Sequence, residues 1–446
     1  MSRRLVILGG GESGTGTAIL AKKQGFDVFL SDGSPLKEAY RNLLISHDIP
    51  FEESGHSVDR LLNADEVMKS PGIPDNLPLV KEIIRKGIPV VSEIEFAGRY
   101  TDALMICVTG SNGKTTTTLL LHHILTRAGF NAGLAGNVGT SFALQVAEEN
   151  YDIYVLEISS FQLDGMFSFR ADVAILTNIT PDHLDRYNND FNRYAGSKFR
   201  ILQNQMPQDA FIYNADDPVI NEWISKNPLS PRAFPFTLSA KPQKSGAWVE
   251  DEKMVININQ NIFNMYLEKL ALQGRHNAYN SMAAGIAAML LKVSRENLRE
   301  SLADFQNVEH RLEFVAKVHG VEFINDSKAT NINSAWYALE CQHRPVIWIA
   351  GGIDKGNDYE IIKPLVLGKV KGIVCLGTDN VKLLETFSDM VDSISDAKSM
   401  DDAVRTAYQM AKDGDVVLLS PACASFDLFE NYEDRGRQFK RAVREL

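Results

Sequence analysis

The sequence predicts an α/β protein with parallel sheets, built from three domains. Three times along the chain an apolar strand leads into a glycine-bearing turn and then into a helix. The strands of these three starts are Leu5–Leu8, Ala103–Val108 and Val346–Ala350. Uninterrupted apolar strands joined by helical crossovers are typical of parallel sheets covered on both faces. We find no internal repeat, so the three starts indicate three domains in a chain of 446 residues.

Further strands are expected in each domain. In the first they are Asp27–Leu30, Val67–Lys69 and Pro89–Ser92, and in the third Gly372–Leu376 and Val416–Leu419. The middle part should contain strands at Ile153–Glu157, Val173–Thr177 and Ala210–Tyr213, a small antiparallel addition around Met254–Ile258, and a buried helix at Asn277–Leu291. We therefore predict domains at 1–93, 94–308 and 309–446.

Composition excludes several classes of protein. The net charge is −11 and no long run of Lys and Arg is present, which argues against nucleic-acid binding. No apolar run reaches the roughly 18 residues of a membrane span, and the apolar start is too short for a signal peptide. The four cysteines are far apart with no CxxC pair, which favours reduced thiols. We expect a cytoplasmic protein without membrane insertion.

The strongest motif follows the strand at Ala103–Val108 and opens the helix expected at Thr115–Thr126. Its residues are Gly110, Ser111, Asn112, Gly113, Lys114, Thr115 and Thr116. Small residues let backbone N–H groups surround phosphate oxygens at a helix N-terminus. Lys114 can reach the terminal phosphates and the Thr115 hydroxyl can bind Mg²⁺. Val108 replaces the first glycine of the full P-loop pattern, but the flanking strand and helix still indicate nucleotide binding.

A second glycine loop, Gly9–Gly14, fits G-x-G-x-x-G after the first strand, and Asp32 ends the next strand where a ribose-binding acid would lie. The pattern alone leaves two interpretations open. One is NAD binding and the other is binding of a different nucleotide diphosphate, because both place a pyrophosphate at the same helix end.

Three residues of the middle domain are candidates for a metal site. Glu157 and His183 each lie at or just beyond the carboxyl end of a strand, the edge at which parallel sheets bind ligands. A carboxylate beside a phosphate loop is a suitable Mg²⁺ ligand. Lys198, considered in isolation, would be a surface lysine on a helix. Its ammonium could not bind a metal unless it were converted to an anion.

The last domain has two loops of small polar residues after strands, Asn325–Thr330 and Ser420–Asp427. Ligand-binding loops have this composition, and so do surface turns. The residues alone do not choose between the two.

Taken together, the motifs resemble the Mur ligase family over essentially the whole chain. The stretches that carry the resemblance are Gly110–Lys114, Glu157–Leu163, Asn325–Asn331 and Ser420–Ser425. Within the family the chain is most similar to the members that add D-glutamate. Folylpolyglutamate synthetases share the ATP loop but not the last two stretches.

The resemblance implies a Rossmann-like first domain, a central P-loop ATPase domain and a Rossmann-like last domain. It implies that Lys114, Thr115, Glu157 and His183 hold ATP phosphates and probably two Mg²⁺ ions, with Lys198 carbamylated by CO₂ as a further metal ligand. The base and ribose of ATP would be bound by Asn277, Asn280, Arg311 and Asp326. The substrate nucleotide would be bound by Glu12, Ser13, Gly14, Asp32, Asn137 and Ser159. D-glutamate would be placed by Lys328, Thr330, Lys355, Ser425 and Phe426.

The implied activity is an ATP-dependent ligation of D-glutamate to UDP-N-acetylmuramoyl-L-alanine through an acyl phosphate, by a monomer. One departure concerns the base, because Asp32 is followed by Gly33-Ser34 where relatives often have Thr-Arg around the uracil ring. Two other classes were weighed. An NAD-dependent oxidoreductase leaves the loop at Gly110–Thr116 unexplained, and a nucleotide-gated binding protein leaves Glu157, His183 and Lys198 unexplained.

Overall fold

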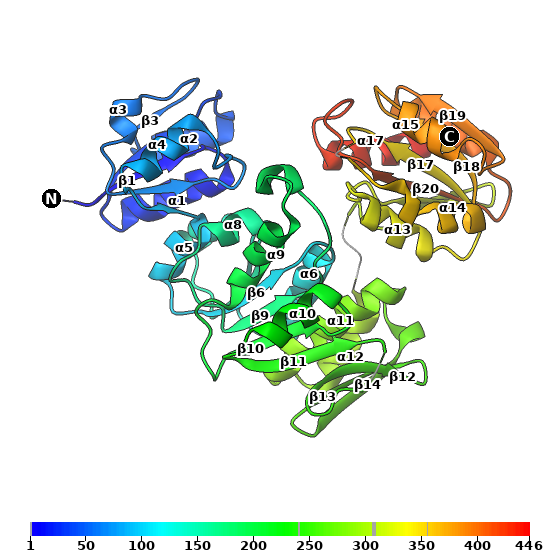
Figure 1. The fold of residues 1–446 in the computed structure, drawn as a ribbon, viewed down its shortest axis with the longest axis horizontal. Coiled ribbons are helices and arrows are strands. Elements are labelled where there is room, and N and C mark those ends of the chain that lie inside the picture. The colour runs from blue at the N-terminus through cyan, green and yellow to red at the C-terminus, as the bar shows by residue number, and fades with distance from the viewer. Residues whose placement is uncertain (1, 240, 306–308, 355) are drawn as a thin grey trace. The chain divides into compact units, whose positions relative to one another are not determined.

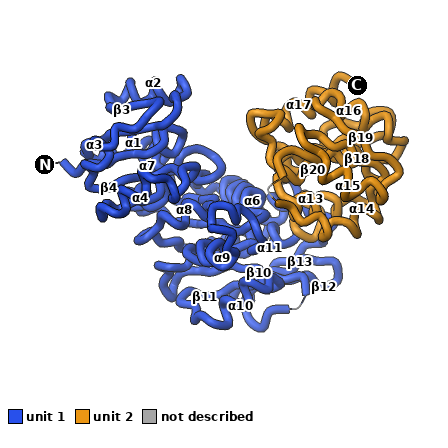
Figure 2. The backbone as a smooth tube through the Cα atoms, turned by 45° about the horizontal axis from the view of Figure 1, so that its top comes forward, with its two compact units in different colours: residues 1–270, 278–304 blue, residues 271–277, 305–446 orange. Residues whose placement is uncertain are grey.

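The computed structural model describes residues 2–239, 241–305, 309–354 and 356–446. These residues form two compact units, shown in Figure 2. Unit 1 comprises residues 1–270 and 278–304, and unit 2 comprises 271–277 and 305–446. Unit 1 contains two sheets and unit 2 contains one (Figure 1). Within the described residues, no helix is long and apolar enough to cross a membrane.

The first sheet of unit 1 is parallel, with strand order β3-β2-β1-β4-β5. Its strands are β1 (Arg4–Leu8), β2 (Asp27–Ser31), β3 (Phe51–Glu52), β4 (Glu66–Lys69) and β5 (Val90–Val91). Its helices are α1 (Glu12–Lys23), α2 (Glu38–Ser46), α3 (Val58–Leu61) and α4 (Pro78–Arg85). Alternate residues of β1 enter different cores: Leu5 and Ile7 pack with α1, whereas Val6 and Leu8 pack with α3 and α4. This two-sided burial explains why the strand is apolar throughout.

The second sheet of unit 1 has nine strands in the order β14-β13-β12-β11-β10-β9-β6-β8-β7. The parallel strands are β6 (Leu104–Thr109), β7 (Ala132–Gly136), β8 (Ile153–Glu157), β9 (Val173–Leu176), β10 (Ala210–Asn214) and β11 (Arg232–Thr237). β12 (Gly246–Glu250) joins them in parallel, and β13 (Lys253–Ile258) and β14 (Asn261–Tyr266) extend the sheet antiparallel. The antiparallel addition predicted around Met254–Ile258 is thus confirmed.

The helices of this part follow the same order along the chain. They are α5 (Glu93–Ala97), α6 (Lys114–Arg127), α7 (Phe142–Glu148), α8 (Ser160–Asp164), α9 (Phe191–Phe199), α10 (Pro218–Lys226), α11 (Arg275–Leu290) and α12 (Arg295–Asp304). Short 3₁₀ turns occur at Gly98–Tyr100, Leu184–Tyr187, Arg200–Leu202 and Leu267–Lys269. One apolar core runs from the first sheet into the second, from Leu5 to Phe211, so the two sheets share a single unit.

Unit 2 is a six-stranded sheet with order β15-β16-β20-β17-β18-β19, parallel except for β15 against β16. Its strands are β15 (Glu313–Val318), β16 (Val321–Asn325), β17 (Val346–Gly351), β18 (Val370–Leu376), β19 (Ser393–Ala397) and β20 (Val416–Ala422). Its helical segments are α13 (Ile332–Glu340), the 3₁₀ turn Tyr359–Ile361, α14 (Lys363–Lys369), α15 (Val381–Phe387), α16 (Met400–Met410) and α17 (Tyr432–Arg444). In β17, Trp348 faces the core with α13 to α15, and Ile347 faces the core with α16 and α17.

The α/β fold with three sheets is as predicted, and the predicted strands agree with the structure to within two residues. Strands made of small or polar residues, such as β7 and β19, were missed because they lack an apolar run. The first sheet ends at Val91 and the second begins at Leu104, on either side of the predicted boundary at 93. The boundary at 308 lies outside the described residues. The three domain limits stay predictions.

Candidate functional site

The loop after β6 is held open by the neighbouring strand end rather than by its own residues. The backbone N–H of Ser111 donates to the carbonyl of Asn178 (2.9 Å), and that of Asn112 donates to the side-chain oxygen of Asn178 (2.9 Å). The Ser111 hydroxyl is 2.7 Å from the Thr180 carbonyl and 2.8 Å from the Tyr194 hydroxyl. The segment after β9 therefore fixes the shape of the loop at the carboxyl edge of the sheet.

Two glycines of this loop are required by its geometry. Gly110 has φ +144°, and a Cβ there would lie 2.0 Å from Oγ1 of Thr177. Gly113 has φ +83° and precedes α6, and a Cβ there would lie 2.4 Å from Oδ1 of Asn280. Asn280 also accepts a hydrogen bond from the Thr117 hydroxyl (3.2 Å). The predicted nucleotide residue Asn280 is thus packed against the loop.

Lys114 and Thr115 begin α6, the helix whose N-terminus faces this loop. The Lys114 ammonium donates to the carbonyls of Gly110 (2.8 Å) and Ser111 (2.7 Å). Thr115 and Thr116 are buried. A flexible ammonium resting on loop carbonyls, beside the positive end of a helix, suits the binding of phosphate oxygens.

Glu157 ends β8 and is almost fully buried. Its Oε1 accepts a hydrogen bond from the side chain of Asn137 (2.8 Å). Its Oε2 is buried and has no hydrogen-bond partner among the described residues. A buried carboxylate oxygen without a donor is costly unless a cation or a proton satisfies it, so the residue fits a metal ligand. The predicted substrate residue Asn137 contacts the predicted metal ligand Glu157 directly.

Lys198 is buried in α9, with 2% of the residue exposed, so its interpretation as a surface lysine is wrong. Its ammonium nitrogen lies 3.4 Å from the Thr109 hydroxyl and 5.2 Å from the centre of the Tyr194 ring. Burial, and then the positive charge of Lys114, lower the pKa of Lys198 well below its usual value. The amine is therefore held in a place that favours its neutral form.

His183 and Ser159 lie on the segments that follow β9 and β8. His183 has a left-handed backbone (φ 51°), and its side chain is 41% exposed and packs edge-on against Phe161 at 5.4 Å between ring centres. Its Nε2 is 3.6 Å from Asp182. Ser159 caps α8 reciprocally with Gln162. His183 thus presents an accessible ring, and Ser159 is occupied in starting a helix.

The glycine loop after β1 is tied to the end of β2 by Asp32. One carboxylate oxygen of Asp32 accepts from the backbone N–H of Gly10 (2.7 Å), and the other accepts from that of Ser34 (2.8 Å). Asp32 therefore holds two loops together with both of its oxygens. Ser13 and Gly14 lie in the first turn of α1, where their backbone can face a phosphate.

The side chain of Glu12 points to the second sheet, because it accepts a hydrogen bond from the backbone N–H of Ser141 (3.2 Å). The hydroxyl of the same Ser141 donates to Glu93 of α5 (2.5 Å). Burial raises the pKa of Glu12, and the negative charge of Glu93 adds to the shift. The Glu12 carboxylate links the glycine loop to α7, so only its backbone is suited to a pyrophosphate.

In unit 2, the two polar loops predicted as ligand sites meet at Asp326. Asp326 is buried, accepts from the Ser420 hydroxyl (2.8 Å) and accepts from the backbone N–H of Leu312 (3.2 Å). Burial raises the pKa of Asp326 to about 7, although the nearby positive charge of Arg311 acts in the opposite direction. Arg311 and Asp326 are therefore close together, as their predicted common role requires.

The residues predicted to place D-glutamate differ in accessibility. Ser425 is buried, Phe426 is 69% exposed, and Lys328 lies over the Tyr432 ring at 5.4 Å. Thr330 is half-buried and its backbone N–H donates to the Lys328 carbonyl (2.9 Å). Lys355 lies outside the described residues. Asn277 belongs to unit 2 and Asn280 to unit 1, so their joint role stays a prediction.

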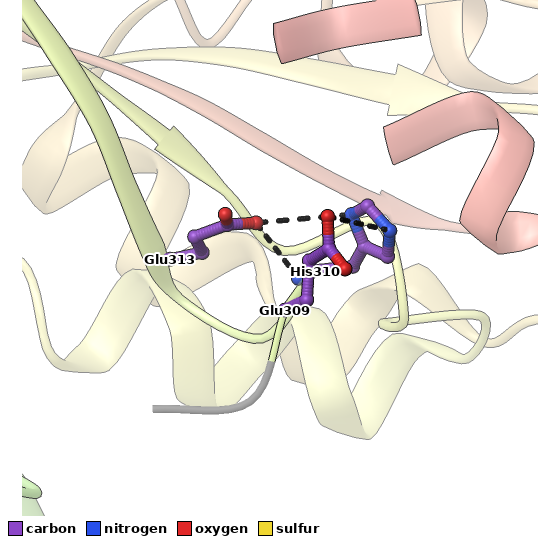
Figure 3. Close-up of side chains that lie close together, drawn as sticks. All are labelled: Glu309, His310 and Glu313. Carbon is purple, nitrogen blue, oxygen red and sulfur yellow. Dashed lines mark hydrogen bonds and ion pairs between the residues drawn. The ribbon is translucent and has the colours of Figure 1, made fainter. Parts of the chain in front are cut away.

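A cluster of Glu309, His310 and Glu313 lies beside Arg311, and Figure 3 shows the three side chains together. His310 is buried, and burial lowers the pKa of its imidazole. Lys440 forms ion pairs with both carboxylates, at 3.0 Å for Glu313. Because an ammonium already neutralises the two acids, the cluster is an ion-pair network that supports the Arg311 turn.

Comparisons with known proteins agree with this geometry. Three family models match the chain: the MurD N-terminal domain at residues 4–77, the Mur ligase middle domain at 108–288, and the Mur ligase, glutamate ligase domain at 310–423. The UDP-N-acetylmuramoylalanine--D-glutamate ligase of Christiangramia forsetii is 54% identical over 446 residues, which cover 100% of both chains. The protein of the same name from Bacteroides fragilis is 56% identical over 445 residues, again covering 100% of both.

The chain belongs to the Mur ligase family. Solved structures of other Mur ligases share the fold. A UDP-N-acetylmuramate-alanine ligase from Thermotoga maritima has a TM-score of 0.63 at 18% identity, with 99% of each chain covered. A pseudomurein peptide ligase from Methanothermus fervidus has a TM-score of 0.63 at 19% identity, with 100% of each chain covered.

Sequence reasoning about this Mur ligase missed the residues that shape its phosphate loop. Asn178, Thr180 and Tyr194 contact the loop from segments more than 60 residues away in the chain. Asn178 and Thr180 belong to the same short segment as His183, so their place after a buried strand was the available signal. Tyr194 lies in α9 with no pattern that distinguishes it from a core aromatic residue.

Proposed function

We propose that this Mur ligase joins D-glutamate to UDP-N-acetylmuramoyl-L-alanine at the expense of ATP, in the synthesis of peptidoglycan precursors. The observation that carries the proposal is the buried carboxylate oxygen of Glu157 near the Gly110–Thr116 loop, in a chain whose relatives of that name match it from end to end. ATP γ-phosphate transfers to the substrate carboxylate, and the D-glutamate amine then attacks the acyl phosphate and releases phosphate.

The central sheet supplies the groups for the phosphoryl transfer. The backbone N–H groups of the Gly110–Thr116 loop and Lys114 would hold the phosphates of ATP, while Asn277, Asn280, Arg311 and Asp326 would bind its base and ribose. Mg²⁺ neutralises phosphate charge when bound, and Thr115, Glu157 and His183 would hold it. The orphaned oxygen of Glu157 supports that assignment.

Lys198 would complete the metal site as a carbamate. CO₂ adds only to a neutral amine, and burial beside Lys114 favours that form of Lys198. The addition joins the amine nitrogen to the carbon of CO₂ and releases one proton, so a group that would repel Mg²⁺ becomes an anion. At 4 Å two unit charges interact by about 1 kcal/mol in water and by about 4 kcal/mol at an effective dielectric of 20.

The outer parts of the chain would hold the two substrates that are joined. The backbone of Glu12, Ser13 and Gly14 would bind the pyrophosphate of the nucleotide substrate, with Asn137 and Ser159 near its muramoyl part. Lys328, Thr330, Lys355, Ser425 and Phe426 would place D-glutamate. A dianionic amino acid needs cationic and hydroxyl donors, and this set contains two lysines and two hydroxyls.

The direct test measures ADP release by the full chain with ATP, the muramoyl-alanine nucleotide and D-glutamate, and then with each omitted in turn. ADP release should require all three, and L-glutamate should not replace D-glutamate. Lys114→Ala should lose about a thousandfold or more of turnover, because a charged group that stabilises the transition state is removed. Lys22→Ala, an exposed lysine of α1, is the matched control. Turnover within a few-fold of the parent for Lys114→Ala would contradict the proposal, and binding of NAD without binding of UDP would favour an oxidoreductase.

A further inference from the structure

His56 lies over the backbone of Gly33 at the carboxyl edge of the first sheet. The residue is exposed and belongs to the segment between β3 and α3. A Cβ at Gly33 would lie only 3.1 Å from Nε2 of His56. Gly33 follows Asp32, which is hydrogen bonded to Gly10 of the glycine loop. His56 therefore lies within two contacts of the loop at which a pyrophosphate binds.

The hydrogen bonds of His56 determine which of its ring nitrogens carries the proton. The Ser31 hydroxyl is 2.7 Å from Oε1 of Glu52 and 2.7 Å from Nδ1 of His56. Burial acts to raise the pKa of Glu52, but hydrogen bonds from Ser57 and Ser31 outweigh it and lower the pKa, so the carboxylate only accepts. Ser31 has a single hydrogen and donates it to Glu52. Its oxygen must then accept from Nδ1–H of His56, which leaves Nε2 of the neutral ring as an acceptor.

This acceptor is not used within the protein. Among the described residues, none donates a hydrogen bond to Nε2 of His56. The neighbouring carboxylates are already engaged: Asp32 binds two backbone N–H groups, and Glu53 binds Arg41 and the backbone N–H of Leu36. The carboxyl edge of the sheet thus presents one fixed imidazole acceptor beside the place of a bound nucleoside.

We propose that His56 recognises the base of the substrate nucleotide, with Nε2 accepting a hydrogen bond from N3–H of uracil. The inference rests on the proposed function, which supplies a uridine nucleotide as substrate. Uracil presents a donor at N3 between two carbonyls, whereas N3 of cytosine is an acceptor. A fixed acceptor therefore favours uracil over cytosine, because cytosine would leave two acceptors facing each other. Gly33 is part of the device, since any side chain there would push against Nε2.

The test compares binding of UDP, CDP and N3-methyl-UDP to the full chain by calorimetry. The parent should bind UDP about fivefold or more tightly than either analogue, the ratio that one neutral hydrogen bond provides. In His56→Ala this ratio should fall close to one, and KM for the nucleotide substrate should rise about fivefold. kcat and the KM values for ATP and D-glutamate should not change. Because removal of the ring also removes any steric conflict with the N3-methyl group, equal binding of the analogues identifies the lost contact.

His47→Ala is the matched control, because His47 lies at the other end of the domain, after α2, and should behave as the parent. Gly33→Ala should reproduce the rise in KM by displacing the ring. If His56→Ala keeps the parent preference for UDP over N3-methyl-UDP, or if the parent does not bind UDP, the inference is wrong. UDP binding is measured without turnover, so a parent chain that binds UDP selectively but releases no ADP would count against the proposed function alone.

Discussion

Replacing Lys198 by methionine should stabilise unit 1 in a pH-dependent manner and abolish ligation. Methionine has a similar length and no charge, so it can fill the same buried space in α9. The pKa of Lys198 is lowered, first by burial and then by Lys114. The folded chain therefore holds a neutral amine at a pH at which the unfolded chain, with a lysine pKa of about 10.4, binds a proton.

The sign follows from proton uptake on unfolding. Between the depressed pKa of the folded state and about 10.4, the unfolded state binds one proton more, so the free energy of unfolding of the parent rises with pH. The slope is about 1.4 kcal/mol per pH unit. Stability is fully present above about pH 10.4 and is lost as pH falls towards the folded pKa. Lys198→Met lacks this loss, so its advantage over the parent should grow by about 1.4 kcal/mol for each pH unit below 10.

Urea unfolding in CO₂-free buffers at pH 8, 9 and 10 measures the effect. Trp223 is a suitable fluorescent reporter because it stacks on Phe199, next to Lys198, with ring centres 4.2 Å apart. Lys226→Met, at an exposed lysine of α10, is the control and should follow the parent. Bicarbonate with Mg²⁺ should stabilise the parent and not Lys198→Met. Identical pH slopes for the parent and Lys198→Met would refute a buried neutral amine.

Three further predictions concern the loops around the site. Gly113→Ala should abolish ATP binding in calorimetry, because its Cβ would collide with a buried amide; Gly129→Ala, at φ +86° but with no atom within 4 Å of the new Cβ, should cost only the backbone strain of about 1 kcal/mol and keep ATP binding. Glu95→Gln should lower the unfolding free energy by about 3 kcal/mol and speed hydrogen exchange of the amides of residues 167–169, because Oε2 of Glu95 accepts three backbone bonds of 2.9, 3.0 and 2.9 Å and charged acceptors are about twice as strong as neutral ones; unchanged exchange would contradict it. Asp326→Asn should remove a loss of stability that the parent shows as pH rises from about 4 to about 7, since a carboxyl with its pKa raised to about 7 binds a proton more readily when folded; chemical denaturation between pH 5 and 8 checks this, and parallel curves would exclude it.

The order and class of the elements could be determined from the sequence because local patterns encode them. The runs at β1, β6 and β17 are apolar at every position, which only a two-sided core requires. The glycine, lysine and threonine of the loop at 110–116 were recognisable because phosphate binding needs them next to one another. Glu157 was found for the same reason, as the last residue of a buried strand.

Only the tertiary structure decided the environment of Lys198. No local pattern distinguishes a lysine that α9 buries under Tyr194 and Thr109 from one on its surface. The same holds for Ser141, whose backbone and hydroxyl bind acids from two distant helices. A pKa and a hydrogen-bond partner depend on groups that approach through space. The sequence by itself therefore determined which chemical groups this Mur ligase carries and on which sheet edge they lie, whereas the packing of segments far apart in the chain decided their protonation and their partners.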